Sequence, residues 1–157
     1  MNKLVVVRHG GYGGARSELT AAGIKQIQKL AEMLGSTVAA EGNRKIFSSP
    51  ESRAQQSAGI LGNVFSIPIE IQDRLWTGLE RATRDNCEWL YDFLSGQNLI
   101  VAIVVTHIDF ANDFPTFFAS KEWGVSKSLP REVKKGEGVV LDLEARTMIL
   151  IEQTQAP

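Results

Sequence analysis

The chain has 157 residues, of which 43% are hydrophobic and 22% are charged, and its net charge is -1. These values predict one soluble globular domain, and the absence of a basic balance argues against a nucleic-acid-binding module. No segment approaches the roughly 18 apolar residues of a membrane span, and the opening apolar run is too short for a signal peptide. The single cysteine, Cys87, excludes an internal disulfide and a Cys-x-x-Cys metal site. We therefore expect one cytoplasmic domain over residues 1–157, with no membrane or nucleic-acid partner.

The first half of the chain alternates between strand-like and helix-like segments. Short apolar runs predict strands over residues 4–7, 45–48 and 67–71. Apolar side chains at helical spacing predict helices over residues 24–34 and 51–61. Thr20 and Ser49 are the expected N-caps of these helices, and Gly35 and Gly62 are their expected ends. Pro68 cannot donate a ladder hydrogen bond, so the third strand is expected to start there or to lie at a sheet edge.

The second half continues this alternation and closes with a hairpin. Helices are predicted over residues 81–94 and 110–119. Between them, residues 99–106 are the most strongly β-like segment, which is typical of a central buried strand. Residues 120–136 are polar and rich in turn residues, which predicts a surface loop. Two further strands are expected as an antiparallel hairpin, over residues 138–143 and 147–152.

Strand–helix alternation repeated four times predicts an α/β fold with helices on both faces of the sheet. We expect a three-layer α/β/α sandwich with a mainly parallel central sheet of about six strands. The C-terminal hairpin must add at least one antiparallel strand. In such open sheets, ligands bind at the carboxyl ends of the strands, so the residues that follow each strand are the candidates for function.

Three of the predicted strands are followed by residues suited to binding an anion. Arg8-His9-Gly10 follows the first strand, Ser48-Ser49-Pro50 with Arg53 follows the second, and Thr106-His107 follows the central one. The chain has only two histidines, and both occupy such strand ends. Guanidinium groups offer planar forks of donors to phosphate oxygens, and the N-terminus of the helix near Pro50 adds anion affinity. An imidazole between two cations should have a lowered pKa, which keeps it neutral and nucleophilic near pH 7.

Other known site patterns fit the chain less well. The segment Gly10–Gly14 lacks the lysine of a P-loop, and Arg16 stands where a dinucleotide motif would have its third glycine. We interpret these glycines as a flexible rim of the pocket. Two histidines beside two arginines would repel a metal cation, and no Gly-x-Ser-x-Gly motif of a serine hydrolase is present. The residues therefore predict an anion pocket that holds an activated histidine.

Four blocks in chain order resemble the histidine phosphatase superfamily, the phosphoglycerate-mutase-like group. They are Val5-Val6-Val7-Arg8-His9-Gly10, Leu19-Thr20-x-x-Gly23-x-x-Gln26, Ser48-Ser49-Pro50-x-x-Arg53, and Val104-Val105-Thr106-His107. The resemblance implies that His9 attacks phosphorus and becomes a phosphohistidine, which water then hydrolyses. It implies that Arg8, Arg53 and His107 bind the phosphoryl oxygens and stabilise the charge of the transition state. It also implies that no metal and no organic cofactor takes part.

The chain departs from the family pattern around the acid that protonates the leaving group. The Gly-x-Trp-Glu-Gly block of mutase-like members is replaced by Arg74-Leu75-Trp76-Thr77-Gly78-Leu79-Glu80. Glu80 is our candidate for that acid, although a glutamate there could equally complement a helix dipole. Asp109 is the alternative, because another branch of the superfamily takes its acid from just after the second histidine; it could instead cap the following helix. Members often carry Thr or Ala where this chain has Tyr12, and Asn where it has Gly14.

The short chain indicates the subgroup. There is room for only one strand and one helix between Leu61 and Leu99, so no large lid is expected and the site should be open. Compact members of this size resemble the phosphohistidine phosphatases, so the substrate is expected to be a phosphoprotein or a phosphorylated small molecule. A phosphoglycerate-mutase-like phosphotransferase and a catalytically weak phosphate-recognition module are the alternative functions. Trp76, Trp123 and Phe114 are each expected in the core.

Overall fold

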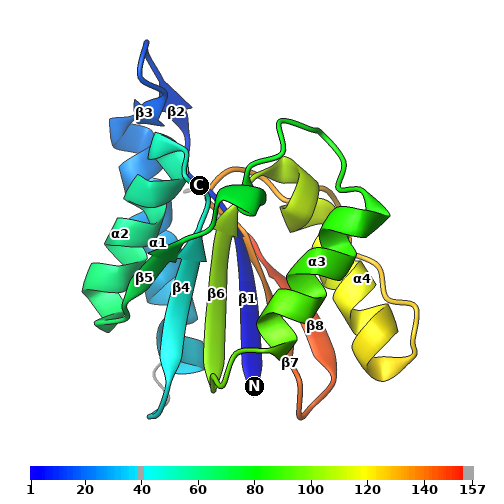
Figure 1. The fold of residues 1–157 in the computed structure, drawn as a ribbon. Helices are drawn as coiled ribbons and strands as arrows, with labels where there is room; N and C mark the ends of the chain where they lie inside the picture. Colours follow the sequence, from blue (N-terminus) through cyan, green and yellow to red (C-terminus); the bar gives the residue numbers. More distant parts are fainter. Residues whose placement is uncertain (39–40, 154–157) are drawn as a thin grey trace.

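The computed structural model describes residues 1–38 and 41–153 and is dominated by one sheet (Figure 1). Its strands are β1 (Lys3–Arg8), β4 (Arg44–Ser48), β5 (Ile69–Ile71), β6 (Val101–Thr106), β7 (Gly138–Asp142) and β8 (Thr147–Ile151). They lie side by side in the order β5-β4-β6-β1-β7-β8. The first four are parallel, whereas β7 is antiparallel to both β1 and β8. The predicted mainly parallel sheet with a C-terminal antiparallel hairpin is confirmed.

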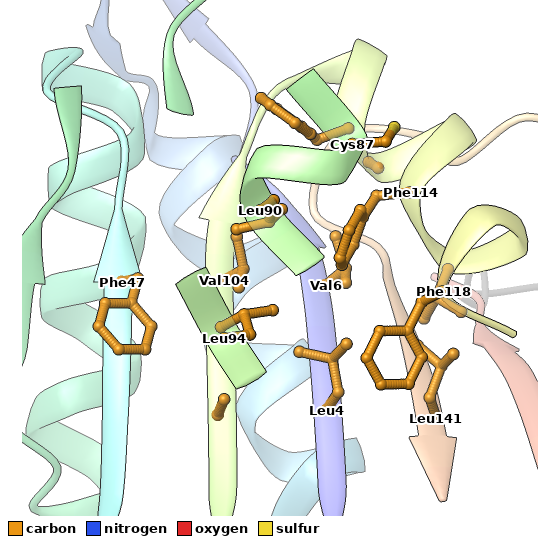
Figure 2. Packing of buried hydrophobic residues seen from close by; sticks show 14 of the residues in the cluster. Leu4, Val6, Phe47, Cys87, Leu90, Leu94, Val104, Phe114, Phe118 and Leu141 are labelled. Atoms are coloured by element: carbon orange, nitrogen blue, oxygen red, sulfur yellow. The ribbon is translucent and has the colours of Figure 1, made fainter. Parts of the chain in front are cut away.

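Helices cover both faces of this sheet. They are α1 (Ala21–Val38), α2 (Ser52–Phe65), α3 (Arg84–Ser95) and α4 (Ile108–Trp123). Because side chains alternate along a strand, Val5 and Val7 of β1 join the core under α1 and α2, whereas Leu4 and Val6 join the core under α3 and α4 (Figure 2). All four of these side chains are fully buried. The three-layer arrangement is thus confirmed, and it explains why β1 and β6 read as continuous apolar runs.

Three helices run further than the sequence predicts. Helix α1 continues through Gly35 to Val38, whose full burial contributes about 2 kcal/mol and exceeds the roughly 1 kcal/mol cost of a helical glycine. Helix α2 continues past Gly62 and ends only at Ser66, in the left-handed conformation with φ 55°. Gly62 serves packing instead, since a Cβ there would lie 3.0 Å from the carbonyl oxygen of Ile67. Helix α4 begins directly after the second histidine and extends into the predicted loop as far as Trp123.

Two small elements were not expected. Strands β2 (Tyr12–Gly13) and β3 (Glu18–Leu19) pair as a short antiparallel hairpin, and a 3-10 helix, η1, spans Asp73–Leu75. Within the glycine-rich segment that the sequence suggests as a rim of the pocket, Tyr12 pairs with Leu19 of this hairpin. None of the helices over residues 1–38 and 41–153 is long and apolar enough to cross a membrane.

Candidate active site

The register of the sheet brings the two histidines together. Arg8 at the end of β1 pairs with Thr106 at the end of β6, so the next residue of each strand lies at the same edge. The backbone N–H of His9 donates to the carbonyl oxygen of Thr106 at 3.1 Å. The two imidazole rings have centroids 5.0 Å apart, in an edge-to-face arrangement. Strand β4 ends level with them, since Ser48 pairs with Val105, and α2 then supplies Arg53.

A cavity of about 160 Å³ opens at this edge of the sheet. Its wall contains five of the residues that the sequence singles out, namely Arg8, His9, Arg53, Glu80 and His107. Tyr12, Trp76 and Leu79 complete much of the rim. The cavity is large enough for a phosphoryl group and leaves little room for the rest of a substrate, which must extend outward.

The backbone fixes the proton position on His9. Nδ1 of His9 lies 2.8 Å from the carbonyl oxygen of Gly10, and a carbonyl only accepts, so Nδ1 carries the ring proton. Nε2 therefore keeps a lone pair. Gly10 is required at this position, because a Cβ would lie 2.6 Å from the carbonyl oxygen of Gly23 on α1. Its N–H donates to Ser57 of α2 at 3.0 Å, which ties the loop after β1 to that helix.

Both imidazoles are held in the neutral form. The pKa of His9 is lowered to about 4 and that of His107 to about 3; burial is the largest cause in both, and the charges of Arg53 and Arg8 contribute to the same shifts. The sequence predicts a lowered imidazole pKa but attributes it to the charges of the arginines. Burial is the larger cause, because the two histidines are only 3% and 4% exposed. At neutral pH Nε2 of His9 therefore carries a lone pair and no proton.

The two arginines face this nitrogen from different elements. Nε of Arg53 donates to Nε2 of His9 at 3.3 Å, and its guanidinium also lies 3.5 Å from the carboxylate of Glu51. Arg8 donates through one guanidinium nitrogen to the carbonyl oxygen of Val133 at 2.9 Å. Nε of Arg8 is buried and has no hydrogen-bond partner within the described part of the chain. A buried donor of this kind costs free energy unless an acceptor such as a phosphate oxygen binds it.

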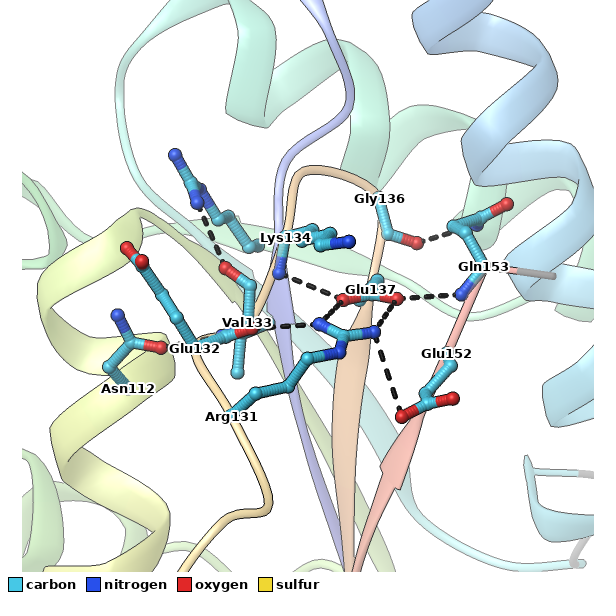
Figure 3. A network of polar contacts seen from close by, with 10 residues as sticks. Asn112, Arg131, Glu132, Val133, Lys134, Gly136, Glu137, Glu152 and Gln153 are labelled. Carbon is cyan, nitrogen blue, oxygen red and sulfur yellow. Dashed lines mark hydrogen bonds and ion pairs between the residues drawn. The ribbon is translucent and has the colours of Figure 1, made fainter. Parts of the chain in front are cut away.

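A buried carboxylate holds the loop that supports Arg8 (Figure 3). Glu137 is completely buried and accepts two hydrogen bonds from the guanidinium of Arg131, at 2.7 and 2.8 Å. It also accepts from the backbone N–H of Lys134 and of Gln153. The N–H of Gly136 in the same loop donates to the carbonyl oxygen of His9 at 2.9 Å. Sequence reasoning missed this network, because its only signal is one glutamate between two glycines before a strand.

Ser49 has a different role from the predicted helix cap. The N-cap of α2 is Glu51, and the Ser49 hydroxyl accepts from the backbone N–H of Glu51 at 3.2 Å. The same oxygen lies 2.7 Å from Nε2 of His107, within hydrogen-bond distance. Ser49 therefore joins the start of α2 to the second histidine. The predicted cap at Thr20 is confirmed, since its hydroxyl accepts from the N–H of Gly23 at 3.1 Å.

The two candidate acids lie in different surroundings. Glu80 lines the cavity beside both histidines and is exposed. Asp109 is only 1% exposed and does not line it; burial raises the pKa of its carboxyl group, which accepts a hydrogen bond from the hydroxyl of Thr77. That bond fastens the segment between Trp76 and Glu80 onto the first turn of α4. The positions thus favour Glu80 as the acid and give Asp109 a structural contact.

Trp76 was expected in the core, and this is wrong. It is 41% exposed, and its ring lies 4.6 Å from that of His107, so it forms part of the pocket wall. Trp76 comes directly after η1, in the segment that leads to α3, and belongs to neither of the two hydrophobic clusters. Phe114 is fully buried as predicted, and Trp123 packs against the same core at its margin.

A wider groove adjoins this cavity. It has a volume of about 700 Å³ and shares Glu80 and Ile108 with the cavity. Its walls come from α4 and from the extended segment 126–132, and they carry charges of both signs. No group of three or more metal-ligating side chains gathers anywhere in residues 1–38 and 41–153.

Comparison with known proteins gives a match to one family model. Residues 4–77 match the histidine phosphatase superfamily, branch 1. The resemblance to the histidine phosphatase superfamily is confirmed. No protein of curated function matches the chain in sequence.

Solved histidine phosphatases share the fold over nearly the whole chain. The predicted phosphohistidine phosphatase SixA from Nakamurella multipartitia is 18% identical with a TM-score of 0.70, over 99% of this chain and 96% of that one. The protein histidine phosphatase SixA complexed with tungstate is 18% identical with a TM-score of 0.63, over 96% and 94%. A mycobacterial glucosyl-3-phosphoglycerate phosphatase is 18% identical with a TM-score of 0.60, over 96% and 97%. At these identities the likeness establishes the fold, which the compact SixA proteins share.

Proposed function

We propose that this protein is a phosphatase that hydrolyses its substrate through a phosphohistidine intermediate on His9. One observation carries the proposal: Nε2 of His9, neutral and unprotonated, lies in a cavity together with Arg8, Arg53 and His107. A nucleophile beside two permanent cations suits transfer of a phosphoryl group better than transfer of an uncharged group. The tungstate in one SixA structure is an oxyanion, in keeping with a phosphate-binding site in this fold.

The proposed reaction has two steps. In the first, Nε2 of His9 attacks phosphorus, the bond from phosphorus to the leaving group breaks, and Glu80 donates a proton to that group. In the second, Glu80 accepts a proton from water, the water oxygen attacks phosphorus, and the bond from phosphorus to Nε2 breaks. Orthophosphate leaves and both side chains return to their starting states. Arg8, Arg53 and His107 hold the phosphoryl oxygens throughout.

We further propose a phosphohistidine on a protein as the substrate, with a phosphomonoester as the broader class. The cavity of about 160 Å³ accepts the phosphoryl group, and the adjoining groove of about 700 Å³ leaves space for a polypeptide. The similar SixA structures are those of phosphohistidine phosphatases by their names. We also propose that residues 1–157 form a single domain, and the cytoplasmic location stays a prediction.

The test is turnover of para-nitrophenyl phosphate by the purified protein and its His9→Ala variant. The wild type should release phosphate, and the variant should lose activity by about a thousandfold or more, because no other group in the cavity replaces the nucleophile. Unchanged activity of His9→Ala would refute the mechanism. A wild type that binds orthophosphate without turnover would be a recognition module.

The same preparation tests the substrate. A peptide carrying phosphohistidine should be dephosphorylated with a higher kcat/KM than a sugar phosphate. Faster release from the sugar phosphate would overturn the substrate assignment and leave the phosphatase assignment intact.

A further inference from the structure

The guanidinium of Arg53 lies over two aromatic rings. Its central carbon is 4.4 Å from the ring centroid of Tyr12 and 5.2 Å from that of Trp76. Arg53 is only 8% exposed, whereas the rings are 38% and 41% exposed. Two large apolar side chains are thus kept at the surface where they cover one cation.

The rings restrict the orientation of the Arg53 guanidinium, which its polar contacts leave free. Its polar side-chain contacts are the hydrogen bond to His9 at 3.3 Å and an ion pair with Glu51 at 3.5 Å. Neither contact fixes the plane of the guanidinium, and an arginine side chain otherwise has many rotamers. Contact with both rings restricts that plane through cation–π attraction, which is strongest for a desolvated cation. The fork of N–H donors is then held in position next to Nε2 of His9.

Each ring is itself held by the protein. Tyr12 pairs with Leu19 in the β2–β3 hairpin, and its ring contacts His9 edge-on with centroids 5.2 Å apart. Trp76 lies against His107, and the next residue, Thr77, donates a hydrogen bond to Asp109. The two rings therefore come from separate segments, each of which is fastened to the site. We call the pair, Tyr12 and Trp76, the aromatic clamp.

We propose that Tyr12 and Trp76 are positioning residues that hold the guanidinium of Arg53 in its catalytic orientation. The proposal rests on the proposed function, because it assigns the clamp a role in binding and transferring a phosphoryl group. The proposed role of Tyr12 depends on the face of its ring and not on its phenol oxygen. An aliphatic residue at position 12 or 76 leaves the guanidinium free to turn away from His9.

The experiment compares Tyr12→Leu with Tyr12→Phe, and Trp76→Leu with Trp76→Phe. We measure kcat/KM for para-nitrophenyl phosphate, its pH profile, the affinity for orthovanadate and the thermal unfolding midpoint. Each Leu variant should lose about tenfold in kcat/KM and in orthovanadate affinity, in the range of a desolvated cation–π contact, whereas the Phe variants should stay within about twofold of wild type. The acid limb of the pH profile should move upward in the Leu variants, because the cation has moved away from His9.

A double variant separates positioning from a general effect on folding. In the Arg53→Met background, Tyr12→Leu should change orthovanadate affinity by less than about twofold, since no guanidinium remains to be held. An equal loss in both backgrounds, or Leu variants that match wild type, would overturn the clamp. Orthovanadate affinity is measured without turnover, so the clamp is tested even if His9→Ala shows that the proposed phosphatase mechanism is wrong.

Discussion

Acidification should destabilise the folded protein through its two histidines. Both have folded-state pKa values far below the ordinary 6.5, at about 4 for His9 and about 3 for His107. In the unfolded chain each imidazole takes up a proton as the pH falls below about 6.5, whereas in the folded state both stay neutral until about pH 4. The unfolded state therefore binds more protons in this window, and the free energy of unfolding falls as the pH falls.

The size of the effect follows from these values. Each histidine contributes a slope of up to about 1.4 kcal/mol per pH unit between its two pKa values. Between pH 6 and pH 5 the unfolded imidazoles are already largely protonated, so each histidine removes about 1 kcal/mol and the pair removes about 2 kcal/mol. This is a large part of the 5–15 kcal/mol that typically stabilises a domain, roughly a fifth for a protein in the middle of that range.

Urea unfolding at a series of pH values measures this loss. The variant His107→Asn removes one titrating group, so it should lose about 1 kcal/mol less than wild type between pH 6 and pH 5. Carboxylates titrate alike in the two proteins and cancel in the comparison. Asn63→His, at an exposed position of α2, adds an imidazole that titrates equally in both states and should follow wild type. Parallel curves for wild type and His107→Asn would refute the neutral, buried state of His107.

Three further substitutions test other contacts. Gly23→Ala would place a Cβ 1.9 Å from the carbonyl oxygen of Gly11 and should lower stability by about 3 kcal/mol in thermal unfolding, whereas Gly59→Ala, with no atom within 4 Å, should not destabilise. Glu80→Gln should slow turnover of alkyl phosphates far more than that of para-nitrophenyl phosphate, whose leaving group needs no proton; equal losses would remove Glu80 as the acid. Glu137→Gln should cost about 2 kcal/mol in urea unfolding, because it weakens the buried pairing with a guanidinium, and an unchanged midpoint would contradict that.

The strand ends explain why much of the site was predictable. Arg8, His9 and His107 follow apolar runs whose parallel pairing is almost dictated by composition, so their meeting at one edge of the sheet follows from topology. Arg53 follows in the same way, as the second residue of α2, the helix after β4. These residues lie where regular secondary structure delivers them.

The remaining parts depend on contacts that local sequence does not encode. Gly35 and Gly62 were read as helix ends, yet α1 continues to the fully buried Val38, and α2 continues to Phe65, which is partly buried against the same core. The place of Trp76 is set by the Thr77–Asp109 hydrogen bond, which joins residues far apart in the sequence. Glu137 and Arg131 similarly act through partners at the far end of the chain. Such residues are found only once the tertiary contacts are known.

Covalent transfer of the phosphoryl group to His9 can be measured directly. The protein is mixed with para-nitrophenyl phosphate, quenched in alkali during turnover and analysed by peptide mass spectrometry, with His9→Ala as the control. We predict the mass of one added phosphoryl group on the peptide that contains His9, and none in the control. Steady turnover with no phosphorylated peptide, or with the phosphoryl group on a different residue, would contradict a phosphohistidine intermediate on His9.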